Sequence, residues 1–76
     1  MTPYLPPHDY QQLAETIALL VRANFKRNRH PFIHPDSLSG LTEDLAAKHD
    51  WDLNDARGFV VCLTAKQARV MLKDIL

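Results

Sequence analysis

Residues 9–25 read DYQQLAETIALLVRANF, and this stretch decides the fold. Its apolar side chains recur every three or four residues, at positions 10, 13, 14, 17, 20, 21 and 25. That spacing places them on one side of an α-helix, and most polar side chains fall on the other side. Asp9 is typical of a helix N-cap, with Gln12 completing a capping-box pair. Because Pro31 disfavours helical geometry at the residue before it, we predict a helix over residues 9–28.

The rest of the chain predicts further short helices. Leucines 38, 41 and 45 share one face of a helix over residues 37–49, for which Ser37 and Ser39 are candidate caps. Asp52 fits the cap of a helix over residues 53–63. Thr64 and Gln67 form another capping-box pair, which predicts a fourth helix over residues 65–75. No Gly or Pro separates the last two segments, so one continuous helix is the alternative.

Prolines mark the two segments that we expect to be non-helical. Those at positions 3, 6 and 7 predict an extended arm over residues 1–8. We expect Tyr4 and Leu5 of this arm to lie against the body of the domain, with a frayed terminus as the alternative. Residues 29–36 contain two prolines and predict an irregular link, whose Phe32 and Ile33 fill the core between helices. The predicted fold is therefore an all-α bundle of three to four short helices with a Pro-rich arm.

Length and composition describe one small globular domain over residues 1–76. The chain is 46% hydrophobic and 24% charged, with a formal net charge of zero. A domain of this size buries only about 60% of its unfolded surface, so we expect a homo-oligomer, in the simplest case a homodimer. The apolar residues that fall outside the main stripes are Leu19, Val61 and Val70. For the core we predict Leu13, Ile17, Leu20, Leu45, Phe59, Val60, Met71 and Leu72.

The single cysteine, Cys62, excludes an intrachain disulfide, and we expect it to be a small buried residue. No apolar run approaches the roughly 20 residues of a membrane span. Residues 1–7 have neither a positive charge nor an apolar core of a secretory signal. We therefore expect a cytoplasmic protein without a membrane association.

One segment resembles a helix-turn-helix, the hairpin that many DNA-binding proteins use. The residues in its characteristic positions are Leu45, Ala46, Asp50, Trp51, Asp52, Ala56 and Phe59. The segment 45–59 departs from the pattern in its turn, where Asp50 replaces the usual Gly. The exposed start of the second helix would present Asn54, Asp55 and Arg57, and carboxylates repel phosphates. A plain helical hairpin of the core is the alternative interpretation.

Charge is unevenly distributed along the chain. Four basic residues and no acid fall between positions 16 and 35, residues 43–55 carry a net charge of −4, and residues 56–73 carry +4. Cations favour helix C-termini, which is one explanation. The other is a partner-binding basic patch of Arg22, Lys26, Arg27, Arg29, Lys66, Arg69 and Lys73. An alternative partner surface comprises Trp51, Asp50, Asp52, Asp55 and Arg57, because Trp is enriched at interface hot spots.

Residue patterns typical of catalysis or metal binding are missing. His30 and His34 are four residues apart, but prolines keep them from sharing a helical face. There is no Gly-rich phosphate loop, and we predict no catalytic residue, no cofactor and no metal. We expect a non-enzymatic regulatory or protein-interaction module that binds a macromolecular partner through a helical face. The alternative is a nucleic-acid-binding transcriptional regulator that uses segment 45–59 and the basic stretches 22–29 and 66–73.

Overall fold

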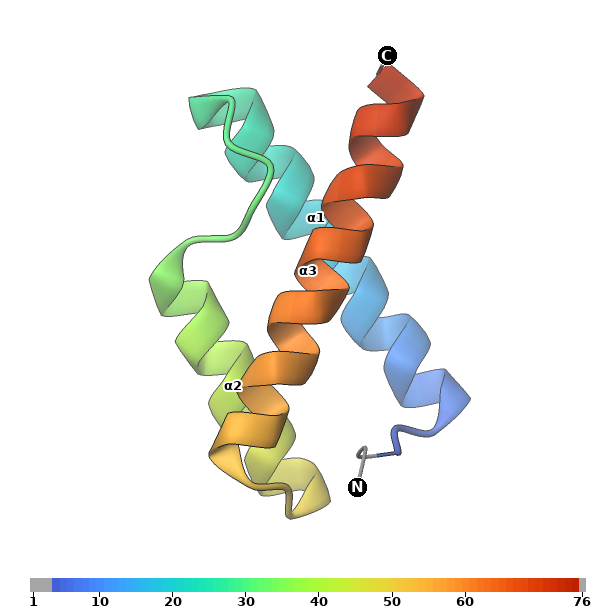
Figure 1. Cartoon of the computed structure of the whole chain (residues 1–76), viewed down its shortest axis with the longest axis vertical. Helices are drawn as coiled ribbons and strands as arrows, with labels where there is room; N and C mark the ends of the chain where they lie inside the picture. Colours follow the sequence, from blue (N-terminus) through green and yellow to red (C-terminus); the bar gives the residue numbers. More distant parts are fainter. Residues whose placement is uncertain (1–3, 76) are drawn as a thin grey trace.

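The computed structural model describes residues 4–75 and places three helices in this range. They are α1 (Pro7–Asn28), α2 (Pro35–His49) and α3 (Leu53–Ile75). Residues 4–75 contain no strand, so the all-helical prediction is confirmed with three helices. α1 and α2 run in opposite directions, and α3 crosses in front of both (Figure 1). α3 packs closely on α1 and on α2, whereas the backbones of α1 and α2 stay apart.

Both α1 and α2 begin at a proline, earlier than predicted. Pro7 and Pro35 each occupy the first helical turn. A proline fits there because its missing N–H would have no partner in any case and its φ is already helical. The predicted cap at Asp9 is therefore wrong: the α1 N-cap is Pro6, with no side-chain cap hydrogen bond. The caps predicted at Ser37 and Ser39 are wrong as well, because the His34 Nδ1 atom accepts the Asp36 N–H at 3.1 Å.

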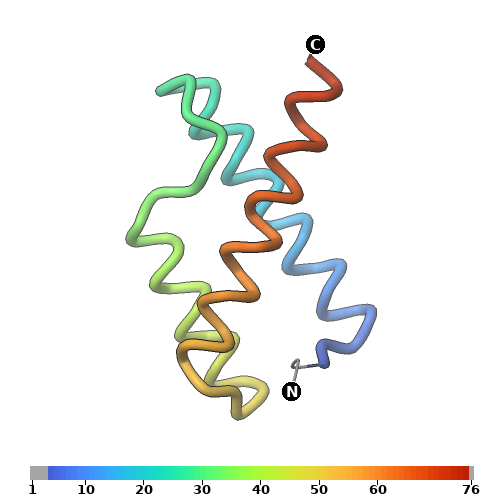
Figure 2. The backbone as a smooth tube through the Cα atoms, in the orientation of Figure 1, coloured from blue at the N-terminus to red at the C-terminus, as the bar shows by residue number. Residues whose placement is uncertain are grey.

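The ends of α1 and α2 agree with the prediction, and both close in the same way. Arg29 (φ 59°) and Asp50 (φ 55°) adopt the left-handed conformation directly after each helix. The Arg29 N–H bonds to the Phe25 carbonyl, and the Asp50 N–H bonds to that of Ala46. Left-handed C-caps of this kind satisfy carbonyls that a helix end leaves unpaired. They turn the chain sharply into the link over residues 29–34 and into the turn over residues 50–52 (Figure 2).

The predicted break between residues 63 and 65 does not occur, and α3 continues through it. The Thr64 hydroxyl donates to the Val60 carbonyl at 2.7 Å. A threonine inside a helix can bond back to the carbonyl four residues earlier instead of capping a new helix, so the capping-box spacing does not mark a helix start here. The predicted cap at Asp52 is confirmed, because its carboxylate accepts the Asn54 N–H at 3.0 Å.

The core lies where α3 crosses the other two helices. Among the predicted core residues, Ile17, Leu45, Val60 and Met71 are buried, whereas Leu13, Phe59 and Leu72 pack against the core while partly exposed. Leu20 was predicted wrongly: it is half-buried and faces the space between α1 and α2. Core residues missing from that prediction are Leu5, Val21, Ala46, Ala56, Leu63 and Ala68. Small alanines at the crossings allow the helix backbones to approach closely.

Several side chains lie elsewhere than predicted. Residues 4–6 are non-helical, as expected of the arm, and residues 1–3 of the predicted arm lie outside the described residues. Leu5 is buried as predicted, but Tyr4 is exposed. In the link, Ile33 packs against the core while Phe32 lies at the surface, next to the tilted His30 ring with ring centroids 5.3 Å apart. Cys62 is exposed, contrary to the prediction of a small buried residue.

Candidate functional site

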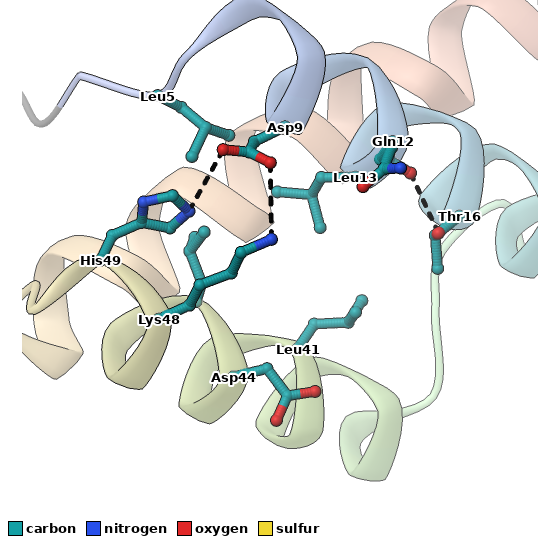
Figure 3. Close-up of a pocket in the computed structure, with 10 residues that line it drawn as sticks. Leu5, Asp9, Gln12, Leu13, Thr16, Leu41, Asp44, Lys48 and His49 are labelled. Carbon is teal, nitrogen blue, oxygen red and sulfur yellow. Dashed lines mark hydrogen bonds and ion pairs between the residues drawn. The ribbon is translucent and has the colours of Figure 1, made fainter.

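A groove separates α1 from α2 on the side away from α3. Its apolar floor comes from Leu5, Leu13, Leu41 and Leu45, and it encloses about 160 Å³. Figure 3 shows α1 and α2 on either side, α3 behind, and Leu13 and Leu41 pointing into the space between them. We call this space the α1–α2 groove. It exists because α3 packs on each of the two helices separately, while the backbones of α1 and α2 stay apart.

One end of the groove is closed by charged and aromatic side chains. The Asp9 carboxylate lies 3.4 Å from the Lys48 Nζ atom and 3.9 Å from the His49 Nε2 atom, which ties α1 to α2 (Figure 3). The His49 ring packs on Trp51, and Trp51 packs edge-on against Phe59. Leu5 of the arm lies over the same end. This end is consequently the more firmly fixed part of the groove.

The space between α1 and α2 continues as a second hollow towards the link. Leu20, Ala23, Asn24 and Arg27 of α1 line it, opposite His34 and Ser37, and it measures about 240 Å³. The Asn24 side-chain amide donates to the Phe32 carbonyl and thereby anchors the link to α1. Arg27 is exposed at this hollow, and Asp44 is exposed on the α2 rim of the groove. These two charges are of opposite sign, with Asp44 at the groove and Arg27 at the adjoining hollow.

The structure divides the predicted basic patch between different surfaces. Lys66, Arg69 and Lys73 are exposed along α3. The Arg22 guanidinium of α1 lies 3.7 Å from the Asp74 carboxylate, near the end of α3. Arg27 instead lines the hollow between α1 and the link.

Two residues of the predicted patch, Lys66 and Arg29, make local contacts with aromatic side chains. The Lys66 Nζ atom lies 3.3 Å from the Tyr10 hydroxyl, and the Arg29 guanidinium lies over the Phe25 ring at 5.5 Å. Lys26 is exposed near the end of α1. The seven basic residues therefore do not form one continuous surface.

The alternative predicted surface lies at the turn between α2 and α3. Trp51 is half-buried between His49 and Phe59, which makes it a packing residue of the hairpin. Asp50, Asp52 and Asp55 are exposed around it. Arg57 is exposed further along α3, next to the α2 side chains. Asp50 in the left-handed conformation meets the turn requirement of the helix-turn-helix-like segment. α3 continues for 16 residues past the end of that segment, from 60 to 75.

No group of three or more His, Cys, Asp or Glu side chains within residues 4–75 is arranged to hold a metal ion. The His30 ring lies next to Phe32, and His34 caps α2. Sequence reasoning missed the α1–α2 groove itself. The apolar stripe of α1 could have indicated it, because the stripe is wider than the part that α3 covers and Leu13 and Leu20 lie on its uncovered side.

Searches for similar proteins found no matching family model, curated protein or solved structure. Among the described residues, no helix combines the length and apolar character required to cross a bilayer.

Proposed function

We propose that this protein is a non-enzymatic interaction module that binds an amphipathic helix of a protein partner in the α1–α2 groove. The observation that carries the proposal is the pair of helices standing apart over a floor of leucines, open on the side away from α3. Grooves of this kind receive the apolar face of a helix, with anchor side chains spaced three or four residues apart.

α3 supports this choice of occupant. It lies across the same two helices from the other side and buries an apolar stripe that includes Val60, Leu63 and Met71. α3 therefore gives an example of a helix that packs against α1 and α2 at once, on one face of the layer. A partner helix in the groove would complete an arrangement of four helices in which Leu13 and Leu41 lose their remaining exposure.

The rim charges specify the partner further. Asp44 lies on the rim of the groove and Arg27 in the hollow that adjoins it, and the described structure gives neither an ion pair. The partner helix should carry a basic residue towards Asp44 and an acidic residue towards Arg27. Such rim charges mainly determine orientation and association rate, while the apolar floor supplies affinity.

The test is a selection of helical peptides from a displayed library against the whole chain. Binding of the selected peptides is then measured for Leu41→Asp in the groove and for Leu19→Asp on the exposed side of α1. We expect Leu41→Asp to abolish binding and Leu19→Asp to leave it unchanged, with the helical circular dichroism of both checked first. Asp44→Lys, which alters only an exposed rim residue, should weaken peptides that carry a base at that end. Equal affinity for the Leu41 and Leu19 variants would overturn the proposal.

A second candidate function is nucleic-acid binding, favoured by the exposed row of Lys66, Arg69 and Lys73 on α3. Each phosphate contact contributes about 0.9 to the slope of log affinity against log salt for duplex DNA. The double variant Arg69→Gln with Lys73→Gln should therefore lower this slope by about 1.8. Duplex DNA that fails to bind even at low salt would remove this candidate.

A further inference from the structure

The arm before α1 places one apolar side chain of the chain itself in the α1–α2 groove. Leu5 is only 8% exposed and lines the groove together with Leu13 of α1 and Leu45 of α2. Its neighbours along the chain, Tyr4 and Pro6, are both exposed. Figure 3 shows the Leu5 side chain pointing from the arm towards the space between α1 and α2. The arm therefore covers part of the apolar surface that the proposed function assigns to a partner.

The arm is attached at this place chiefly through the Leu5 side chain. Within residues 4–75, the backbone of residues 4 and 5 forms no hydrogen bond. The backbone bond nearest to them joins the Tyr10 N–H to the Pro6 carbonyl at 2.9 Å and belongs to the start of α1. A segment that is held by the burial of one side chain can leave its place without breaking a hydrogen-bonded element.

Two prolines set the direction of the arm. Pro6 is extended, with φ −54° and ψ 145°, and Pro7 opens α1. Proline fixes its own φ and also restricts the residue before it, here Leu5, to extended conformations. Residues 4–6 turn from the start of α1 towards the end of α2 (Figure 1). Because the prolines restrict the arm before it closes, placing Leu5 in the groove costs less conformational entropy than it would for a flexible arm.

The groove is too small for a docked helix while Leu5 is in place. Its open part measures about 160 Å³. An apolar cavity of about 150 Å³ holds one benzene-sized group, so the open part accommodates about one anchor side chain. A helix in a groove inserts several anchors, spaced three or four residues apart. The adjoining hollow extends the space on the side of the link only, so a helix that covers the whole floor takes the place of Leu5 at the other end.

We propose that Leu5 competes with the partner helix for the α1–α2 groove, and that the arm opens when the partner binds. This inference rests on the proposed function, because it concerns the same groove and the same partner. In the free protein, Leu5 occupies the end of the groove. In the complex, an apolar side chain of the partner lies there instead, and residues 4 and 5 are released into solvent. The closed arm thereby lowers the apparent affinity by the fraction of molecules in which the groove is open.

The test compares Leu5→Ser with Tyr4→Ser, a matched control because it alters the neighbouring residue of the same arm, whose side chain is 74% exposed. Helical peptides are selected separately against the wild type and against Leu5→Ser, and each peptide is titrated against all three chains. Burial of a leucine side chain favours the closed arm by about tenfold or more, and the ordering of the arm offsets part of this. We expect Leu5→Ser to bind at least about threefold more tightly than the wild type, and Tyr4→Ser to bind equally well.

The outcomes separate this inference from the proposed function. Peptides that lose binding with Leu41→Asp, yet bind Leu5→Ser no more tightly than the wild type, would overturn the competing role of Leu5 and leave the groove as the binding site. If neither selection yields peptides that depend on Leu41, the proposed function fails, and the role of Leu5 fails with it.

A measurement on the wild-type chain avoids any effect of Leu5→Ser on folding. Leucine methyl resonances are recorded for the free chain and for its complex with a selected peptide. In the free chain we expect magnetisation transfer between the methyl groups of Leu5 and those of the other leucines that line the groove. In the complex this transfer should disappear, and the Leu5 methyl groups should take the chemical shifts of a solvent-exposed leucine. Transfer that persists in the complex would overturn the proposal.

Discussion

Replacing Gly58 by alanine should stabilise the protein. Gly58 lies in the interior of α3, five residues after its start, on an exposed face. A Cβ atom built there meets no heavy atom within 4 Å, so the added methyl group causes no clash. The backbone is helical, and glycine has no conformational use at this position.

The magnitude follows from the freedom that glycine loses on folding. Alanine is favoured over glycine inside a helix by about 0.5–1 kcal/mol. In a domain of this size, 1 kcal/mol raises the Tm by about 4–8 °C, so Gly58→Ala should raise it by about 2–8 °C. Gly40→Ala in α2 meets the same conditions and should act alike, since its Cβ also meets nothing within 4 Å.

The assay is reversible thermal unfolding followed by circular dichroism at the helix band, with the wild type and both single variants measured in the same buffer. The double variant should show the sum of the two shifts, because the residues lie on different helices. A Tm for Gly58→Ala at or below that of the wild type would refute the reasoning. It would mean that residue 58 is not inside a regular, uncrowded helix.

Three further predictions concern single residues. Ile17→Ala leaves a cavity at a fully buried site and should lower the free energy of unfolding, measured by urea titration, by about 2–5 kcal/mol. Leu20→Ala, outside the core, should lower it clearly less, and equal costs would contradict the described core. Asp50→Val should destabilise the fold by about 1–2 kcal/mol, because a β-branched residue resists positive φ. Asp50→Gly should not destabilise the fold, and thermal melts of the two variants distinguish these outcomes. Native Cys62 should react with a thiol reagent at nearly the rate of the urea-unfolded chain, and strong protection of the thiol would show that α3 is covered on that side.

Local sequence signals predicted the helices better than their beginnings. The stripe of α1 and the leucine spacing of α2 identified both helices and their ends near Asn28 and His49. The starts differ from the prediction because proline, which breaks a helix interior, is favourable in the first turn, where Pro7 and Pro35 lie. The continuity of α3 was missed because Thr64 has two uses, as a cap or as a donor to the carbonyl of Val60, and sequence spacing does not distinguish them.

The candidate surfaces depend on tertiary contacts that a single helix pattern does not contain. Val61 was identified as lying outside the main stripe, and the structure shows it exposed. That it adjoins Phe32 and Leu38 follows from how the link returns beside α3. The α1–α2 groove likewise arises from the spacing that α3 imposes on its two neighbours. Amphipathic periodicity indicates which side of a helix is apolar but not whether one partner covers all of it.

The most direct test of the interaction module is a nuclear magnetic resonance measurement on the chain with isotope-labelled leucine methyl groups, bound to a selected helical peptide. We predict intermolecular contacts from the peptide's apolar side chains to the methyl groups of Leu13, Leu41 and Leu45 on the floor of the α1–α2 groove. The methyl groups of Leu19 and Leu53, which are exposed elsewhere, should show none. Contacts to Leu53 or Leu19 without contacts to Leu13 and Leu41 would contradict the account.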